Sequence, residues 1–171
     1  MRKLCLMLGL VLLPLLVRGA DLQPVLKREL QRCAAAWQRG DYEGILAYLP
    51  PQVLQHAGGR AAWKQVLKEQ FAEIRATGVK RLEAIPGRAP DPKPVGRWLV
   101  SLIPLTAVLH GAHLELTQDT HVLGLSADRG KHWYFVPLYE VSQAELNAWF
   151  PELAGRVVVP RDPLPRFEFV Y

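Results

Sequence analysis

The chain has 171 residues and a formal net charge of +5, from 21 Lys and Arg against 16 Asp and Glu. Three of these cations lie in the first 18 residues, which contain no acidic residue, so the remainder carries 18 basic against 16 acidic side chains. This near-neutral balance, without a run of Lys or Arg, gives no electrostatic case for nucleic-acid binding. The length predicts one domain.

The first 19 residues have the organisation of a cleavable secretory signal peptide. Met1-Arg2-Lys3 is a basic start, the run from Leu4 to Val17 is apolar, and Val17 and Gly19 suit the −3 and −1 positions of a cut after residue 19. A membrane span needs roughly 20 apolar residues, whereas this run has 14 and contains Pro14. We therefore expect an exported protein, periplasmic or secreted, with no membrane span after cleavage.

Cysteine use excludes an intrachain disulfide in the mature protein. Cys5 leaves with the signal peptide, so only Cys33 remains. A lone Cys in an exported chain can be reactive or can pair between chains. A buried, inert thiol is the favoured interpretation, because Cys33 falls on one stripe of a helix, at steps of four and three residues. The stripe consists of Leu22, Leu26, Leu30, Cys33 and Trp37.

Three helices are predicted next. The first covers residues 22–38 and ends before Gly40, which suits a helix C-terminus. Asp41 can cap a short second helix over residues 42–49, and Pro50-Pro51 forbids its continuation. A third helix follows Gly58-Gly59 and stops at Gly78, and its apolar face comprises Trp63, Val66, Leu67, Phe71 and Ile74.

After Gly78 the hydrophobic period becomes extended. Strands are predicted over residues 79–85, 97–109, 113–125 and 131–139, with a proline-rich connection over 86–94 and a terminal strand over 157–159. Pro104 inside the second of these strands indicates an edge position or a bulge. Ser142 and Glu145 form a capping box that opens a short helix to Phe150. We assign residues 20–159 to a single domain and 160–171 to a proline-rich tail.

Helices followed by antiparallel hairpins predict an α+β fold, with the N-terminal helices packed in the concave face of a curved, cone-shaped sheet. The order of elements and two local patterns, Trp37 to Tyr42 and Gly58-Gly59-Arg60, resemble the nuclear-transport-factor-two-like superfamily. Its other members include SnoaL-like cyclases and ketosteroid isomerase. The resemblance covers residues 22–139 and implies a pocket between sheet and helices. Pro50-Pro51-Gln52 stands where the enzymes tend to have an acidic residue, which argues against isomerase chemistry.

The most specific local motif is Ser-x-Asp-x-Gly-x-x-Trp at residues 126–133, which resembles the Asp-box hairpins of sialidase-like propellers. Ser126 and Asp128 can accept backbone N–H bonds across the bend, Gly130 can adopt positive φ, and Trp133 can fold back. A propeller would repeat the motif, and one carboxylate is too few for calcium. We interpret the motif as a structural hairpin.

A second pattern places polar residues on one face of the strand over residues 113–125. Two His and two carboxylates could bind a metal, but a solvated face is favoured, and a partner surface stays open. These residues are His113, Glu115, Thr117, Asp119 and His121.

Aromatic and polar residues could line a ligand pocket, although most aromatics at these spacings form core. The candidates are Tyr42, Trp63, Trp98, Ser101, His121 and Tyr134. No nucleophile elbow, phosphate-binding Gly loop or zinc motif occurs, so we expect neither cofactor nor metal. Three functions stay open: a binding or accessory domain for a small hydrophobic ligand or protein partner, which is preferred; a small pocket enzyme acting on a hydrophobic substrate; and an interaction module, with a homodimer as one form.

Overall fold

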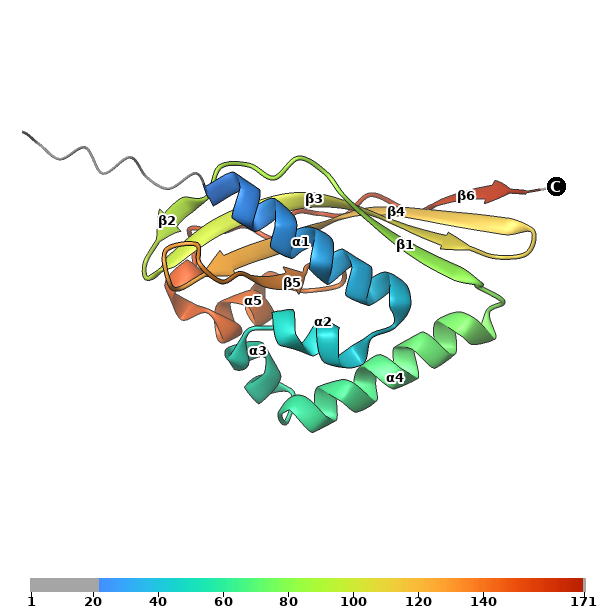
Figure 1. The fold of residues 1–171 in the computed structure, drawn as a ribbon, viewed down its shortest axis with the longest axis horizontal. Helices are drawn as coiled ribbons and strands as arrows, with labels where there is room; N and C mark the ends of the chain where they lie inside the picture. The colour runs from blue at the N-terminus through green and yellow to red at the C-terminus, as the bar shows by residue number, and fades with distance from the viewer. Residues whose placement is uncertain (1–21, 171) are drawn as a thin grey trace, which may run out of the picture.

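Helices come first in the chain and a strongly curled antiparallel sheet, a half-barrel, follows them (Figure 1). The computed structural model describes residues 22–170, so the predicted signal peptide and Cys5 lie outside the described residues. The predicted α+β class is confirmed. The four N-terminal helices are α1 (Leu22–Arg39), α2 (Tyr42–Tyr48), α3 (Pro51–His56) and α4 (Arg60–Ala76).

Local signals explain where most of these helices begin. The Asp41 carboxylate accepts the N–H of Gly44 at 3.0 Å and caps α2, as expected. Helix α3 was not predicted, because Pro50-Pro51 was interpreted only as a stop. Proline is favoured at the first helical position, where its missing N–H costs nothing, and Pro51 occupies that position.

Six strands form one sheet in the order β1-β3-β4-β5, with β2 paired to β3 and β6 paired to β4. All of these pairings are antiparallel. The strands are β1 (Arg81–Pro86), β2 (Lys93–Val95), β3 (Trp98–His110), β4 (Leu114–Ser126), β5 (Tyr134–Pro137) and β6 (Arg166–Phe169). Between β5 and β6 lie α5 (Gln143–Trp149), with the predicted capping box on Ser142, and the 3₁₀ helix η1 (Pro151–Leu153).

The structure differs from the predicted strands in four places. Strand β2 begins inside the proline-rich connection, and β5 is shorter than the predicted 131–139 because the preceding residues form the hairpin bend. Residues 157–159 form no strand; the N–H of Val159 instead donates to Gln143 Oε1 at 2.9 Å. The proline-rich tail continues into the sheet as β6.

Pro104 lies in a strand that is paired on both sides, not at the edge of the sheet. Its carbonyl accepts the N–H of Gly87 at 2.8 Å, one residue beyond the end of β1 at Pro86. The nitrogen of Pro104 points to the same side as this carbonyl, so its missing N–H falls where the β1 ladder stops.

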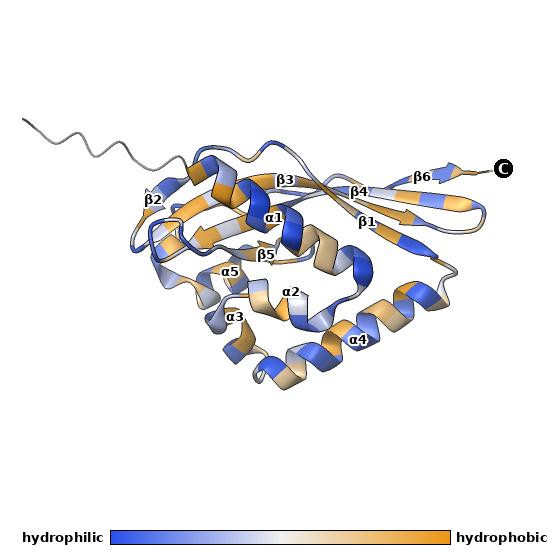
Figure 2. Ribbon diagram, in the orientation of Figure 1, coloured by the Kyte–Doolittle hydropathy of each residue, from blue (hydrophilic) through white to orange (hydrophobic). Residues whose placement is uncertain are grey.

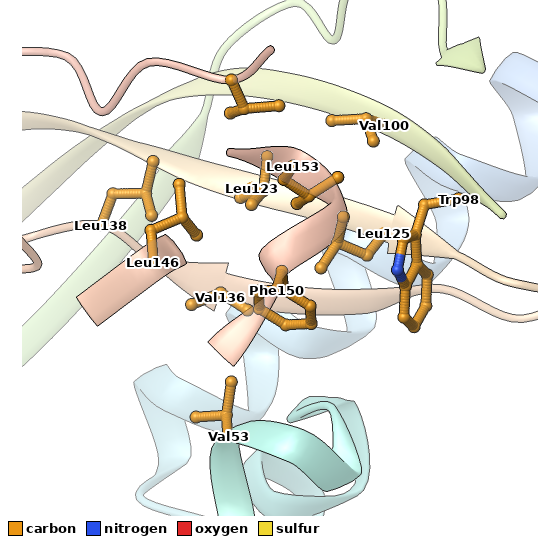
Figure 3. Close-up of a cluster of buried hydrophobic side chains, with 11 residues drawn as sticks. Val53, Trp98, Val100, Leu123, Leu125, Val136, Leu138, Leu146, Phe150 and Leu153 are labelled. Atoms are coloured by element: carbon orange, nitrogen blue, oxygen red, sulfur yellow. The ribbon is translucent and has the colours of Figure 1, made fainter. Parts of the chain in front are cut away.

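Side chains on the two faces of the sheet form two cores. On one face, α1 places Leu26, Leu30 and Cys33 against Ile103, Val122, Trp133 and Phe135. On the other face, α5 and η1 place Leu146, Phe150 and Leu153 over the strands (Figure 3). We call the second cluster the C-terminal core, and its members are Val53, Trp98, Val100, Leu123, Leu125, Val136, Leu138, Leu146, Phe150, Leu153 and Val157.

The β3–β4 hairpin extends past the helices, and β6 runs beside its far end (Figures 1 and 2). Within residues 22–170, no helix combines the length and the apolar character needed to cross a membrane.

Candidate functional site

The six predicted pocket residues do not come together in one site. Trp98 belongs to the C-terminal core, and Trp63 and Tyr134 pack against that cluster. The Trp63 indole N–H donates to the carbonyl of Val53 at 3.0 Å. Ser101 belongs to the opposite face of the sheet, as its alternation with Trp98 requires, and its hydroxyl donates to Pro90 at 2.9 Å.

Two of these residues carry a polar atom without a partner in the described part of the chain, namely Trp98 Nε1 and His121 Nδ1. Trp98 is buried edge-on against Phe150, with ring centroids 5.8 Å apart. His121 lies opposite Pro104 across the β3–β4 ladder, and its backbone carbonyl accepts the N–H of Leu138. Neither residue lines the two surface grooves described below.

The Asp-box motif forms a closely bonded bend. Ser126 Oγ accepts the N–H of Gly130 at 2.8 Å, and Asp128 accepts the N–H groups of Lys131 and His132 at 3.0 and 2.9 Å. The Trp133 indole folds back and donates to Gly130. Burial alone would raise the pKa of Asp128, but hydrogen bonds from His132 and Ser126 lower it to about 2. These bonds stabilise the hairpin itself.

Two members of the polar row, Glu115 and Asp119, are paired with side chains of neighbouring strands. His110 on β3 lies between two carboxylates, 3.1 Å from Glu83 and 2.8 Å from Glu115. Asp119 accepts bonds from Thr106 and Arg166 at 2.7 Å each, and these two bonds lower its pKa. Among residues 22–170, no three His, Cys, Asp or Glu side chains are arranged to hold a metal ion.

Two surface grooves remain as candidate sites. The first, of about 340 Å³, lies where the tail crosses beside β4. Its lining includes three prolines together with Tyr139, Glu140 and Asp162. Asp162 accepts a hydrogen bond from Thr120 at 2.9 Å, and burial together with Glu140 raises the pKa of Tyr139. No base is paired with a nucleophile in this groove.

The second groove, of about 250 Å³, has a more distinctive chemistry. It lies where α1 ends, α4 ends and β1 begins (Figure 1). We call it the basic groove, because its lining contains four cations and no carboxylate. The lining residues are Gln38, Arg39, Gly40, Tyr42, Phe71, Ile74, Arg75, Val79, Lys80, Arg81 and Leu82.

The floor of the basic groove is apolar and aromatic. Phe71 is buried, stacks on Trp37 at 5.9 Å and meets Tyr42 edge-on at 5.6 Å. Gly40, at φ +63°, turns the chain between α1 and α2, and a side chain there would contact the Phe71 ring at 3.5 Å. The glycine therefore permits the turn and places no side chain over the Phe71 ring.

The cations around this floor are mostly unneutralised. Arg81 lies 3.4 Å from Glu83. Arg75 donates only to two neutral oxygens, the carbonyl of Phe71 at 3.0 Å and the hydroxyl of Tyr42 at 3.1 Å. Arg39 and Lys80 are exposed, and neither side chain has an ion pair within residues 22–170. The groove therefore presents three positive charges that no described carboxylate balances.

The carboxylates with displaced pKa values lie elsewhere. Bonds from Lys64 and Arg60 lower the pKa of Glu43 to about 2, and the bond from Ser142 lowers that of Glu145. Together with Asp119 and Asp128, they do not line either groove. Burial raises the pKa of the Cys33 thiol to about 12, so the expectation of a buried, unreactive thiol agrees with its 6% exposure.

No protein-family model, no curated protein and no solved structure matches the chain. The site must therefore be interpreted from its own chemistry. Of the six predicted pocket residues, Tyr42 alone lines the basic groove. The cations were missed, since Arg39, Arg75 and Lys80 come from separate segments and form no run in the sequence.

Proposed function

We propose that the protein is an exported binding domain of the nuclear-transport-factor-two-like type, and that its basic groove holds a small amphiphile with one anionic group. The signal-peptide pattern supports export. The α+β half-barrel is compatible with the cone-like fold of that superfamily. Since one fold hosts many functions, the ligand class rests on the groove alone.

The observation that carries the proposal is an apolar floor surrounded by unbalanced cations. A ligand's apolar body would cover the half-buried Ile74 and Leu82 beside the buried Phe71 ring, and burying apolar surface contributes about 25 cal/mol per Å². Its carboxylate, sulfate or phosphate would accept from the free N–H donors of Arg75 and from Lys80. The volume of the basic groove, about 250 Å³, lies just below the roughly 300 Å³ at which typical ligand sites begin. This volume favours a small molecule or one end of a longer one.

Four probes with eight carbons each separate charge from hydrophobicity: octanoate, octyl sulfate, octanol and octylamine. We expect calorimetric titration to show binding of the two anions, weaker binding of octanol and none of octylamine. Binding of the anions should weaken as salt screens the cations. Equal binding of octanol and octanoate, or no binding of octanoate, would refute the proposal.

Variants locate the bound anion. Arg75→Gln and Lys80→Gln should each weaken octanoate binding by about 3- to 10-fold, in line with the net value of one hydrogen bond. Arg156→Gln is the matched control, because Arg156 is exposed, lies outside the groove and has no ion pair in the described chain. An equal loss in all three variants would place the anion elsewhere.

A further inference from the structure

Strand β6 is a short edge strand with exposed aromatic residues. It pairs with β4 on one side, and its other side is unpaired within the described residues. Phe167 is 58% exposed and Phe169 74% exposed, although both lie on one face of the sheet beside Leu116 and Leu114. An open edge of this kind is a template for another strand.

The hydrogen-bond register shows which groups of β6 face outward. The N–H of Val170 donates to the carbonyl of His113 at 3.0 Å, so Val170 faces β4, and Glu168 and Arg166 follow in alternation. The N–H and carbonyl groups of Phe167 and Phe169 therefore point away from the sheet. Pro165 points the same way and can accept a hydrogen bond without donating one.

Charge on the other face of β6 is not fully balanced by the described residues. Glu168 lies directly opposite Glu115 across the β4–β6 ladder. Like charges at such positions are destabilising. Glu115 is paired with His110 at 2.8 Å, whereas Glu168 has no ion pair within residues 22–170. The cation nearest in sequence, Arg166, is already bound to Asp119 at 2.7 Å.

We propose that β6 pairs antiparallel with β6 of a second copy of this chain, with Phe167 on the two-fold axis. This register places Arg166 of each copy opposite Glu168 of the other, which supplies the missing cation on both sides. It brings the two Phe167 residues together as a hydrogen-bonded pair and sets Phe169 opposite Pro165. It also places Leu164 (88% exposed) opposite Val170 (50% exposed).

The neighbouring registers are less favourable. An axis through Glu168 would place the two Glu168 carboxylates directly opposite each other, and an axis through Arg166 would do the same with two guanidinium groups. Arg166 can serve both Asp119 and the partner's Glu168, because its guanidinium has five N–H donors. The charges thus select one register among those that the outward-facing backbone groups allow.

Residues 164–170 form a small interface, so the dimer should be weak and its Kd micromolar or higher. Sedimentation velocity of the purified protein over a concentration series should show a monomer–dimer equilibrium. Glu168→Arg should weaken this dimer at least 10-fold, whereas Glu73→Arg, the same charge change on exposed α4, should leave it unchanged. A monomer at every concentration up to about 1 mM would overturn the proposal.

Cross-linking tests the register independently of affinity. Hydrogen-bonded antiparallel partners have Cα atoms about 5.5 Å apart, within disulfide reach, so Phe167→Cys should form a covalent dimer under mild oxidation. Cys33 is buried and will not compete. Glu168→Cys should cross-link poorly, and preferential cross-linking at 168 would overturn the Phe167-centred register. Circular dichroism of each variant tests whether the fold persists.

Discussion

The guanidinium of Arg75 donates to the hydroxyl of Tyr42 at 3.1 Å, across 33 residues of sequence. A second bond, from Nε to the carbonyl of Phe71 at 3.0 Å, holds the same group. The two bonds fix the position of a cation that has no carboxylate partner in the described chain. For the proposed ligand, Arg75 would therefore already be in position before the ligand arrives, which would reduce the entropic cost of binding.

Tyr42→Phe tests this orientation without changing the charge or the apolar floor of the basic groove. We expect octanoate binding to weaken by about 2- to 10-fold, which corresponds to the net value of one hydrogen bond. Thermal stability should change little, since Tyr42 is half-buried. Tyr48→Phe is the matched control, because Tyr48 donates to Glu29 at 3.2 Å and lies outside the groove. Unchanged binding in Tyr42→Phe would mean that Arg75 does not meet the anion.

The Asp-box hairpin is predicted to be sensitive to substitution at Gly130. Its φ is +85°, and a Cβ there would lie 2.5 Å from Leu22 Cδ2 of α1. Gly130→Ala should lower the free energy of unfolding by about 1–2 kcal/mol, measured by chemical denaturation. Gly155→Ala separates the backbone strain of a positive φ from the steric contact with Leu22. Gly155 has φ +70°, and nothing lies within 4 Å of a Cβ built there. A smaller loss for Gly130→Ala than for Gly155→Ala would contradict the packing argument.

Periodic patterns in this chain predicted structure well where the deciding contacts are local. The stripe that contains Leu26, Leu30 and Cys33 is buried as its helical spacing requires. The hairpin bend at residues 126–133 and the capping box on Ser142 also formed as expected, because each is complete within a few residues.

Two of the features that were missed, strand β6 and the basic groove, depend on distant parts of the chain. Strand β6 follows a proline-rich stretch, and its Arg-Phe-Glu-Phe alternation becomes a strand only because β4 is long enough to offer a second pairing site. The basic groove likewise needs α1, α4 and β1 to meet. A pattern within one segment could not indicate either feature.

The thiol of Cys33 should react only when the protein opens. It is 6% exposed, and burial raises its pKa to about 12, so almost no thiolate is present at pH 8. We expect iodoacetamide to leave the Cys33 peptide unmodified in the native protein and to alkylate it fully in denaturant, as followed by mass spectrometry. Rapid native labelling would show that α1 detaches from the sheet. Leu30→Ala, which removes a neighbour in the same core, should speed native labelling.

Asp128 is expected to make the stability of the protein depend on pH in the acid range. Its pKa is lowered from 3.8 to about 2, so its contribution is complete above pH 4 and is lost as the pH falls toward 2. Because the side chain is 37% exposed, solvent screening limits this contribution to about 1 kcal/mol. Asp128→Asn should therefore be about 1 kcal/mol less stable than the wild type at pH 7, and the difference should shrink toward zero near pH 2. Glu73→Gln, which removes an exposed carboxylate from α4, should show no such difference at either pH. A constant gap between wild type and Asp128→Asn across the range would show that the carboxylate's charge is not what stabilises the hairpin.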